Sequence, residues 1–339
     1  CTTCLYRVRD RIVNPNAPWQ AEHEIDGEVA RRLIEELCPQ LAPADLETAG
    51  QGWDNTVFRV NRQWVFRFPR RQLGADLLDA EVAILPRVAE RVPVSIPVPL
   101  WVGRPGEDYP WRCTGGEWIA GESVAVRGPD PGQRLELAQS LGEFLLAVHA
   151  VSADEATGWG APGDEIGRLD PELRIPRTRN YLRRAAEAEL IADPHAWDAI
   201  IDGFADDAGP SIDPCLQHGD LYARHLLLDD RCHLTGVIDW GDLHVGDRAV
   251  DLSAAWLVLP PEARERFLEV YGVIDLLTWR RARFRAVFHA AVVMVFASET
   301  DEPDCALEVA GWHELKVLFS LLSTWHTRKE DGEGMPKTR

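Results

Sequence analysis

Six ionisable side chains that could serve catalysis or metal binding lie around two short apolar runs in the stretch HGDLYARHLLLDDRCHLTGVIDWGD, residues 218–242. They are His218, Asp220, His225, His233, Asp239 and Asp242. Carboxylates beside an imidazole can orient a hydroxyl, accept its proton and bind a divalent cation. Phosphoryl transfer asks a protein for these parts, together with a cation on the nucleotide phosphates.

The spacing of these residues indicates how they could meet. We expect strands at 226–229 and 234–238, and a tight hairpin brings the start of its first strand close to the end of its second. His225 and Asp239 should therefore converge, with Asp220 just ahead of the first strand. The hairpin thus predicts one place shared by a base and two metal ligands.

The elements before this stretch are mostly β-prone. A helix is predicted at 26–38 behind Asp26 as N-cap. A flexible, glycine-bearing loop then leads into a hairpin with strands at 56–60 and 64–68. A helix at 73–90 and a proline-punctuated, then strand-like segment at 92–103 follow. These patterns predict a small, mostly antiparallel sheet with one long helix.

Helical periodicity dominates from about residue 123 onward. The predicted helices are 133–150, 178–191, 195–207, 262–271, 278–298 and 305–324. The most apolar stretch, 286–297, is too short to span a bilayer and predicts a buried helix. Together the patterns favour an α+β, bilobal architecture: a β-rich lobe, a short connector, and a mostly helical lobe that holds a small hairpin.

Composition limits the partners. The net charge is −19 and the pI is about 4.9, which argues against nucleic acid and anionic membranes as partners because both need clustered basic residues. A cationic small substrate and a merely soluble acidic surface fit this charge equally well. The seven cysteines are scattered and odd in number, which favours a reducing cytoplasm over a disulfide framework.

HGDLYARH followed by GVIDWGDLHVGDRAVDL resembles the signature of the aminoglycoside phosphotransferase family. This family has a protein-kinase-like bilobal fold and phosphorylates hydroxyls of small molecules with ATP or GTP. HGD matches the HxD of the kinase catalytic loop, and IDWG takes the place of DFG. Upstream, GQGWDNTVFRV, WVFRFPRR, LLDAEVAIL, IPVPLWVG and EWIAGES resemble the family's nucleotide loop, first strands, glutamate helix, next strand and hinge.

The resemblance implies roles for the residues of the opening stretch. It makes Asp220 the catalytic base or orienting group, with His218 in the same catalytic motif as a scaffold for the loop. It makes Asp239 the main Mg²⁺ ligand and places His225 where the second ligand would be. Asp242 either faces the substrate or belongs to a solvated turn.

In the first lobe the resemblance implies the nucleotide contacts. Arg67 falls where the phosphate-clamping lysine would be, and Glu81 falls where its ion-pair partner would be. Gly50 and Gly52 would let the loop backbone approach the phosphates. The backbone from Glu117 to Ile119 would meet the purine.

The same comparison divides the chain. We expect an N-terminal extension at 1–22, a nucleotide-binding lobe at 23–116 and a hinge at 117–122. A catalytic and acceptor-binding lobe would follow at 123–327, and a polar tail at 328–339. In GDRAVDL, Asp247 and Asp251 resemble a structural motif in which Asp247 caps the next helix.

Two positions depart from the usual family pattern. Arg67 replaces lysine, and the chain has only three lysines, all beyond residue 310, so a general drift to arginine explains the change as well as a special role does. His225 replaces asparagine, as in some members that act on the 2″-hydroxyl of aminoglycosides and in macrolide kinases. Mg²⁺ prefers oxygen, so we expect either weaker Mg²⁺ binding or a water molecule between His225 and the ion. If a neutral imidazole binds the ion, Mg²⁺ binding should also weaken as pH falls.

These inferences predict a cytoplasmic, Mg²⁺-dependent kinase that transfers the terminal phosphoryl of ATP or GTP to a hydroxyl of an amine-bearing antibiotic, with an aminoglycoside as the first choice. A macrolide acceptor stays open because the chain has thirteen tryptophans. A metabolic acceptor such as choline, homoserine or a sugar is a second alternative. A nucleotide-binding pseudokinase is a third, and the intact Asp220 and Asp239 argue against it.

Overall fold

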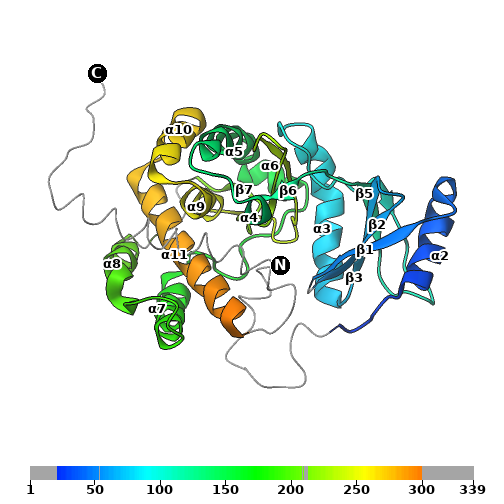
Figure 1. Cartoon of the computed structure of the whole chain (residues 1–339), viewed down its shortest axis with the longest axis horizontal. Coiled ribbons are helices and arrows are strands. Elements are labelled where there is room, and N and C mark those ends of the chain that lie inside the picture. Colours follow the sequence, from blue (N-terminus) through cyan, green and yellow to red (C-terminus); the bar gives the residue numbers. More distant parts are fainter. Residues whose placement is uncertain (1–20, 53, 208, 210–212, 300–339) are drawn as a thin grey trace.

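The computed structural model describes residues 21–299 apart from 53, 208 and 210–212, and it separates a sheet-containing part from a helical part (Figure 1). The sheet has five strands in the order β1-β2-β3-β5-β4, and every pair is antiparallel. Its strands are β1 (Leu46–Gln51), β2 (Asn55–Val60), β3 (Trp64–Pro69), β4 (Trp101–Val102) and β5 (Thr114–Glu117).

Alternating apolar residues give this sheet one buried face. Phe58 and Val60 of β2 and Phe66 and Phe68 of β3 are buried and form a core of their own with helix α2 (Gly27–Leu37). Asp26 caps α2 by accepting from the backbone N–H groups of residues 28 and 29, as predicted. The predicted hairpin is confirmed, because β2 and β3 pair along their whole length.

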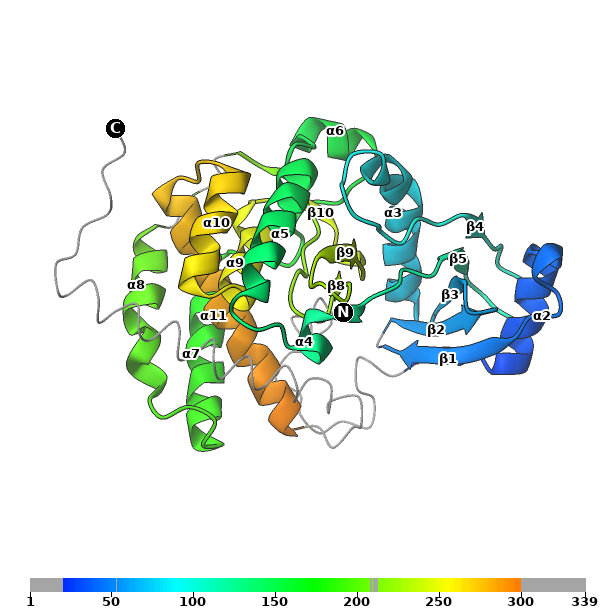
Figure 2. The same cartoon turned by 45° about the horizontal axis from the view of Figure 1, so that its top comes forward.

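Helix α3 (Gln72–Ala89) lies between the two parts of the molecule (Figures 1 and 2). Its buried Ile84, Leu85 and Val88 belong to the large hydrophobic core of the helical part, whereas its earlier turns follow directly from β3. The helix therefore carries Glu81 to the boundary between sheet and helices, and the prediction of a helix at 73–90 is confirmed.

The second part is mainly helical. Its helices are α4 (Val124–Arg127), α5 (Gln133–His149), α6 (Ala153–Gly158), α7 (Pro171–Glu187), α8 (Asp198–Asp206), α9 (Ala249–Val258), α10 (Pro261–Tyr271) and α11 (Leu276–Glu299). The short 3₁₀ helices of the chain are η1 (Pro39–Leu41) and η2 (Pro194–Trp197). Two small sheets join β6 (Glu122–Ser123), β8 (Leu226–Leu228) and β9 (Leu234–Val237), and β7 (Cys215–Gln217) with β10 (His244–Gly246). The expected α+β, bilobal fold is confirmed.

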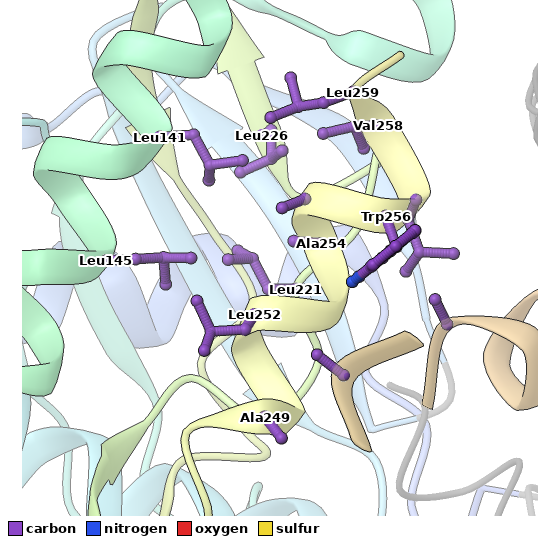
Figure 3. Packing of buried hydrophobic residues seen from close by; sticks show 14 of the residues in the cluster. Leu141, Leu145, Leu221, Leu226, Ala249, Leu252, Ala254, Trp256, Val258 and Leu259 are labelled. Atoms are coloured by element: carbon purple, nitrogen blue, oxygen red, sulfur yellow. The ribbon is translucent and has the colours of Figure 1, made fainter. Parts of the chain in front are cut away.

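The core of this part fixes the stretch that carries the candidate chemistry. Figure 3 shows Leu141 and Leu145 of α5 facing Leu252 of α9, with Leu221 and Leu226 between the helices. Leu221 and Leu226 are nearly inaccessible to solvent. Their burial anchors the segment 220–225 at both ends, since moving either leucine would open a cavity in a close-packed core.

Some element predictions were wrong. Helix α7 begins at Pro171, seven residues before the predicted start, because Asp170 caps it and proline is well tolerated in a first helical turn. The expected flexible loop before β2 is largely strand β1. The predicted helix at 305–324 and the polar tail lie outside the described residues. In the described part, no helix is long and apolar enough to cross a membrane.

Candidate active site

The hairpin of β8 and β9 brings the predicted residues together. Leu226 pairs with Val237, so the residue before β8 and the second residue after β9 meet at one end of the hairpin. His225 Nε2 lies 3.2 Å from Asp239 Oδ2. The predicted convergence of His225 and Asp239 is therefore confirmed.

Asp220 completes a compact cluster. His225 Nδ1 lies 2.7 Å from the backbone carbonyl oxygen of Asp220 and 3.8 Å from its Oδ2. One ligand atom from each of Asp220, His225 and Asp239 falls within 4.8 Å of the others. Asp220 and His225 are buried, whereas the Asp239 side chain is 35% exposed, so the cluster opens on the Asp239 side.

Hydrogen-bond polarity indicates that this cluster suits a cation. A backbone carbonyl can only accept, so His225 Nδ1 carries a proton in its contact with Asp220. In a neutral imidazole Nε2 then presents a lone pair to the Asp239 carboxylate. Two lone pairs 3.2 Å apart repel each other unless a proton or a metal ion lies between them. The donor set of one imidazole and two carboxylates therefore fits a divalent cation.

The electrostatics of the cluster favour positive charge, whether a proton or a cation carries it. Burial alone would lower the pKa of His225, but the carboxylates of Asp239 and Asp220 outweigh it and raise that pKa above its usual value. Asp239 has a left-handed backbone conformation with φ of 64°. Such a conformation is uncommon for a residue other than glycine and places the carboxylate at a sharp turn after β9.

Asp251 of α9 holds the backbone of the segment that carries Asp220. Its two carboxylate oxygens accept from His218 N at 2.6 Å and Gly219 N at 2.8 Å. Gly219 has φ of 88°, and a Cβ there would lie 2.2 Å from the Asp242 carbonyl oxygen. Only glycine fits this turn.

His218 connects this turn to the segment that carries Asp239. Its Nε2 lies 3.0 Å from the Ile238 carbonyl oxygen, next to Asp239, and its ring is fully buried. Burial lowers the pKa of His218. His218 therefore joins the two segments that carry Asp220 and Asp239 and does not enter the cluster itself.

Arg67 and Glu81 form a bidentate ion pair beside the cluster. Arg67 Nη1 donates to Glu81 Oε1 at 3.2 Å, and Nη2 donates to Oε2 at 2.5 Å. A Cβ built on Gly241 would lie 3.9 Å from both Glu81 Oε1 and Asp239 Oδ1. The pair therefore borders the turn that carries Asp239. Burial raises the pKa of Glu81, and the Arg67 guanidinium opposes that rise.

The predicted nucleotide loop lies on the edge strand β1, and the predicted hinge follows the interior strand β5. A β-bulge interrupts the pairing of β1 just before Gly50, and Gly52 N donates to the Asn55 carbonyl oxygen. A Cβ at Gly50 would meet no atom within 4 Å, so the space over this loop is open. Glu117 ends β5, and Ile119 packs so closely on Gly236 of β9 that a Cβ there would clash.

Asp242 does not lie in a solvated turn, which was one of its two sequence-based expectations. Its side chain is buried and accepts from Arg168 Nη2 at 2.6 Å, while Arg168 Nη1 donates to Asp164. It therefore belongs neither to a solvated turn nor to the cluster of Asp220, His225 and Asp239. Sequence reasoning missed Arg168, because nothing in its spacing connects it to a residue 74 positions later.

Two further expectations concern turns. The N-cap residue of α9 is Arg248, which makes no side-chain cap hydrogen bond, so the prediction of Asp247 as the cap is wrong by one residue. Asp247 still supports the start of the helix, because its Oδ1 accepts from Ala249 N at 2.9 Å. His233 lies in the turn between β8 and β9 and contacts Asp229. Neither residue contributes a ligand atom to the cluster.

A family model described as the phosphotransferase enzyme family matches residues 45–285. The chain belongs to this family. It is 31% identical over 191 residues to an aminoglycoside 3′-phosphotransferase from Streptomyces fradiae, across 52% of this chain and 67% of that relative. It is 27% identical over 178 residues to viomycin phosphotransferase from Streptomyces vinaceus, across 50% and 62% of the two chains.

Solved structures of this fold include both aminoglycoside and macrolide enzymes. A GDP complex of aminoglycoside 2′-phosphotransferase-IIIa covers 87% of this chain and 99% of its own, with a TM-score of 0.62 and 23% identity. A macrolide 2′-phosphotransferase from Brachybacterium faecium covers 85% and 97%, with a TM-score of 0.55 and 24% identity. These structures share the fold of this chain, and the family model makes the chain a phosphotransferase.

Proposed function

We propose that this phosphotransferase moves the terminal phosphoryl group of ATP or GTP to a hydroxyl of an aminoglycoside. The cluster of Asp220, His225 and Asp239 carries the proposal, because it joins a buried carboxylate to a site suited to a divalent cation. The 31% identity to an aminoglycoside phosphotransferase supports the acceptor class.

Asp220 is the residue that acts on the acceptor. Its carboxylate would orient the hydroxyl and take its proton as the oxygen bonds to phosphorus and the nucleoside diphosphate leaves. The backbone of Asp220 is fixed on either side, because Gly219 N donates to Asp251 and Leu221 is buried. A fixed carboxylate needs little reorganisation during the reaction.

His225 and Asp239 would hold Mg²⁺. The ion, when bound, supplies positive charge to the phosphate oxygens. The role of the protein is to orient the ligands: the Asp220 carbonyl fixes the imidazole of His225, and the turn after β9 fixes Asp239. A backbone carbonyl on the second ring nitrogen is the usual support of a metal-binding histidine.

Arg67 would clamp the nucleotide phosphates. The bidentate pair with Glu81 holds its guanidinium at the border of the metal-binding turn, and arginine stays charged at any physiological pH. The open loop at Gly50 and Gly52 would cover the phosphates, and the backbone near Glu117 and Ile119 would contact the purine. Residues 218–220, which carry Asp220, are called the catalytic turn below. His218 contributes by joining this turn to the residue that follows β9.

A macrolide acceptor is the second candidate. The family relatives with the same fold include macrolide phosphotransferases, and one of them spans 85% of this chain. Both candidates use the same cluster and differ only in what the acceptor side binds.

An acceptor screen tests the proposal. Purified protein with Mg²⁺ and either ATP or GTP is incubated with aminoglycosides, viomycin-type peptides, macrolides and small metabolites, and an added phosphate is detected by mass. We expect phosphorylation of at least one aminoglycoside, and loss of that product in Asp220→Asn. Turnover confined to macrolides or to metabolites would replace the acceptor class, and no turnover with any acceptor would contradict the proposal.

A further inference from the structure

A chain of buried polar residues lies behind the catalytic turn. His149 at the end of α5 has Nε2 3.6 Å from Asp251 Oδ2, and its Nδ1 lies 2.8 Å from the Tyr271 hydroxyl at the end of α10. His149, Asp251 and Tyr271 are each at most 7% exposed. None of the three belongs to the cluster of Asp220, His225 and Asp239, and the proposed chemistry does not use them directly.

Asp251 is the residue that links these buried polar side chains to the catalytic turn. Both of its oxygens accept backbone N–H groups, from His218 and Gly219, and the same Oδ2 faces His149. Burial would raise the pKa of Asp251, but the facing His149 and the backbone donors lower it, so the carboxylate is ionised. An ionised, fully buried carboxylate needs all of its partners, since losing one leaves a buried charge partly uncompensated.

The direction of the hydrogen bonds follows from what each group can do. His149 Nε2 faces the Asp251 carboxylate at 3.6 Å, which is beyond hydrogen-bond distance, and the ionised carboxylate would repel a lone pair on that nitrogen, so the tautomer with its proton on Nε2 is favoured. In the neutral imidazole Nδ1 then accepts, and the Tyr271 hydroxyl donates to it. Burial raises the pKa of Tyr271, so the hydroxyl keeps its proton. The Arg248 guanidinium also interacts with this hydroxyl, and because a guanidinium can only donate, it leaves the hydroxyl proton for His149.

We propose that His149 is a positioning residue of the catalytic turn, acting on Asp251, and that the Tyr271 hydroxyl sets the tautomer and orientation of its imidazole. This inference rests on the proposed role of Asp220. Residues at the ends of α5 and α10 and in α9 would thereby fix the backbone of the segment that carries Asp220.

The test compares two tyrosines that each lose one buried hydroxyl. Tyr271→Phe removes the donor to His149. Tyr109→Phe is the matched control, because Tyr109 is also buried and donates to the Pro69 carbonyl oxygen in the other part of the molecule. We expect Tyr271→Phe to lower kcat about 3- to 10-fold with the nucleotide KM unchanged, and Tyr109→Phe to lower the melting temperature alone. Equal kcat values in the two variants would overturn the proposal.

Replacing the histidine gives a second measurement. We expect His149→Leu to lower kcat about 10- to 100-fold, the range for partners that orient a reactive group. His149→Gln, whose amide can still donate to Asp251, should recover part of that loss. Combining His149→Leu with Tyr271→Phe should cost no more than His149→Leu alone, because the hydroxyl acts through the imidazole. Fully additive losses would contradict the chain of contacts.

Amide exchange separates this inference from the proposed function. The amides of His218 and Gly219 should exchange with solvent faster in His149→Leu than in the unchanged protein, in the absence of nucleotide and acceptor. If the protein phosphorylates no acceptor, the proposed function fails, and the exchange rates still decide whether His149 supports the turn. Unchanged exchange at both amides would overturn the positioning role.

Discussion

The imidazole of His225 is held by the backbone of Asp220. Its Nδ1 contact with the Asp220 carbonyl fixes the ring, and Nε2 is thereby directed at Asp239. The sequence predicted the meeting of His225 and Asp239 from the hairpin alone. It could not predict the carbonyl contact, because that depends on how residues 220–225 turn between two buried leucines.

Asp220→Asn should abolish phosphoryl transfer while leaving nucleotide binding intact. The amide is isosteric with the carboxylate but cannot accept a proton at neutral pH, and general base catalysis contributes about 10²- to 10⁴-fold. Single-turnover transfer to an identified acceptor and binding of a fluorescent nucleotide measure the two effects. A variant that keeps most of its kcat would remove Asp220 from the chemistry.

His225→Asn should lower the Mg²⁺ concentration needed for half-maximal activity, because an amide oxygen suits this hard cation better than an imidazole nitrogen does. His225→Ala should raise that concentration severalfold and leave Asp239 without its facing partner. Mg²⁺ titrations of activity at fixed pH measure both changes. If all three proteins need the same Mg²⁺ concentration, His225 does not bind the metal.

At the scale of elements, periodicity predicted the parts that face a core. The hairpin of β2 and β3 and helix α3 each bury one face, and a buried face leaves a regular apolar pattern. Strands β8 and β9 are buried almost throughout, and their short apolar runs carried the signal instead. Helix α7 was predicted too short because Pro176 interrupts its pattern while the helix continues. The Arg168–Asp242 pair could not be predicted, since long-range polar contacts leave no periodic signal.

The Arg67–Glu81 pair connects β3 to α3. Its contribution to stability can be separated from its proposed contribution to nucleotide binding. Glu81→Ala should destabilise the fold by roughly 3 kcal/mol, because it leaves the guanidinium buried without its partner. The double variant Arg67→Met with Glu81→Leu should regain much of that stability and still fail to bind nucleotide. Urea unfolding and nucleotide titrations measure the two properties. Tight nucleotide binding by the double variant would exclude Arg67 as the phosphate clamp.

At the scale of the whole molecule, two hydrophobic cores stabilise separate parts of the chain. One lies between α2 and the five-stranded sheet, and the other fills the helical part and includes the last turns of α3. The turn at Asp239, the Arg67–Glu81 pair and the segment from Glu117 to Ile119 all lie where these parts meet. A nucleotide bound there would contact both parts, so binding and the stability of the whole fold should be linked.

The stability of the fold should also depend on pH through His289 of α11. This side chain is 4% exposed, and its ring packs at a tilt against Tyr222. Burial lowers the pKa of His289 to about 3, whereas a histidine in the unfolded chain has a pKa of about 6.5. Between these values the unfolded state binds the additional proton, so stability falls as pH falls. We expect a loss on the order of 2 kcal/mol between pH 7 and pH 4.5 from this residue.

Urea unfolding of the metal-free protein at several pH values measures this loss. His289→Gln should flatten the dependence between pH 7 and pH 4.5, whatever its stability at neutral pH, because glutamine binds no proton in either state. His195→Gln is the control, since the His195 side chain is 78% exposed and solvated in both states. The same slope in all three proteins would show that His289 is protonated as readily in the folded chain as in the unfolded one.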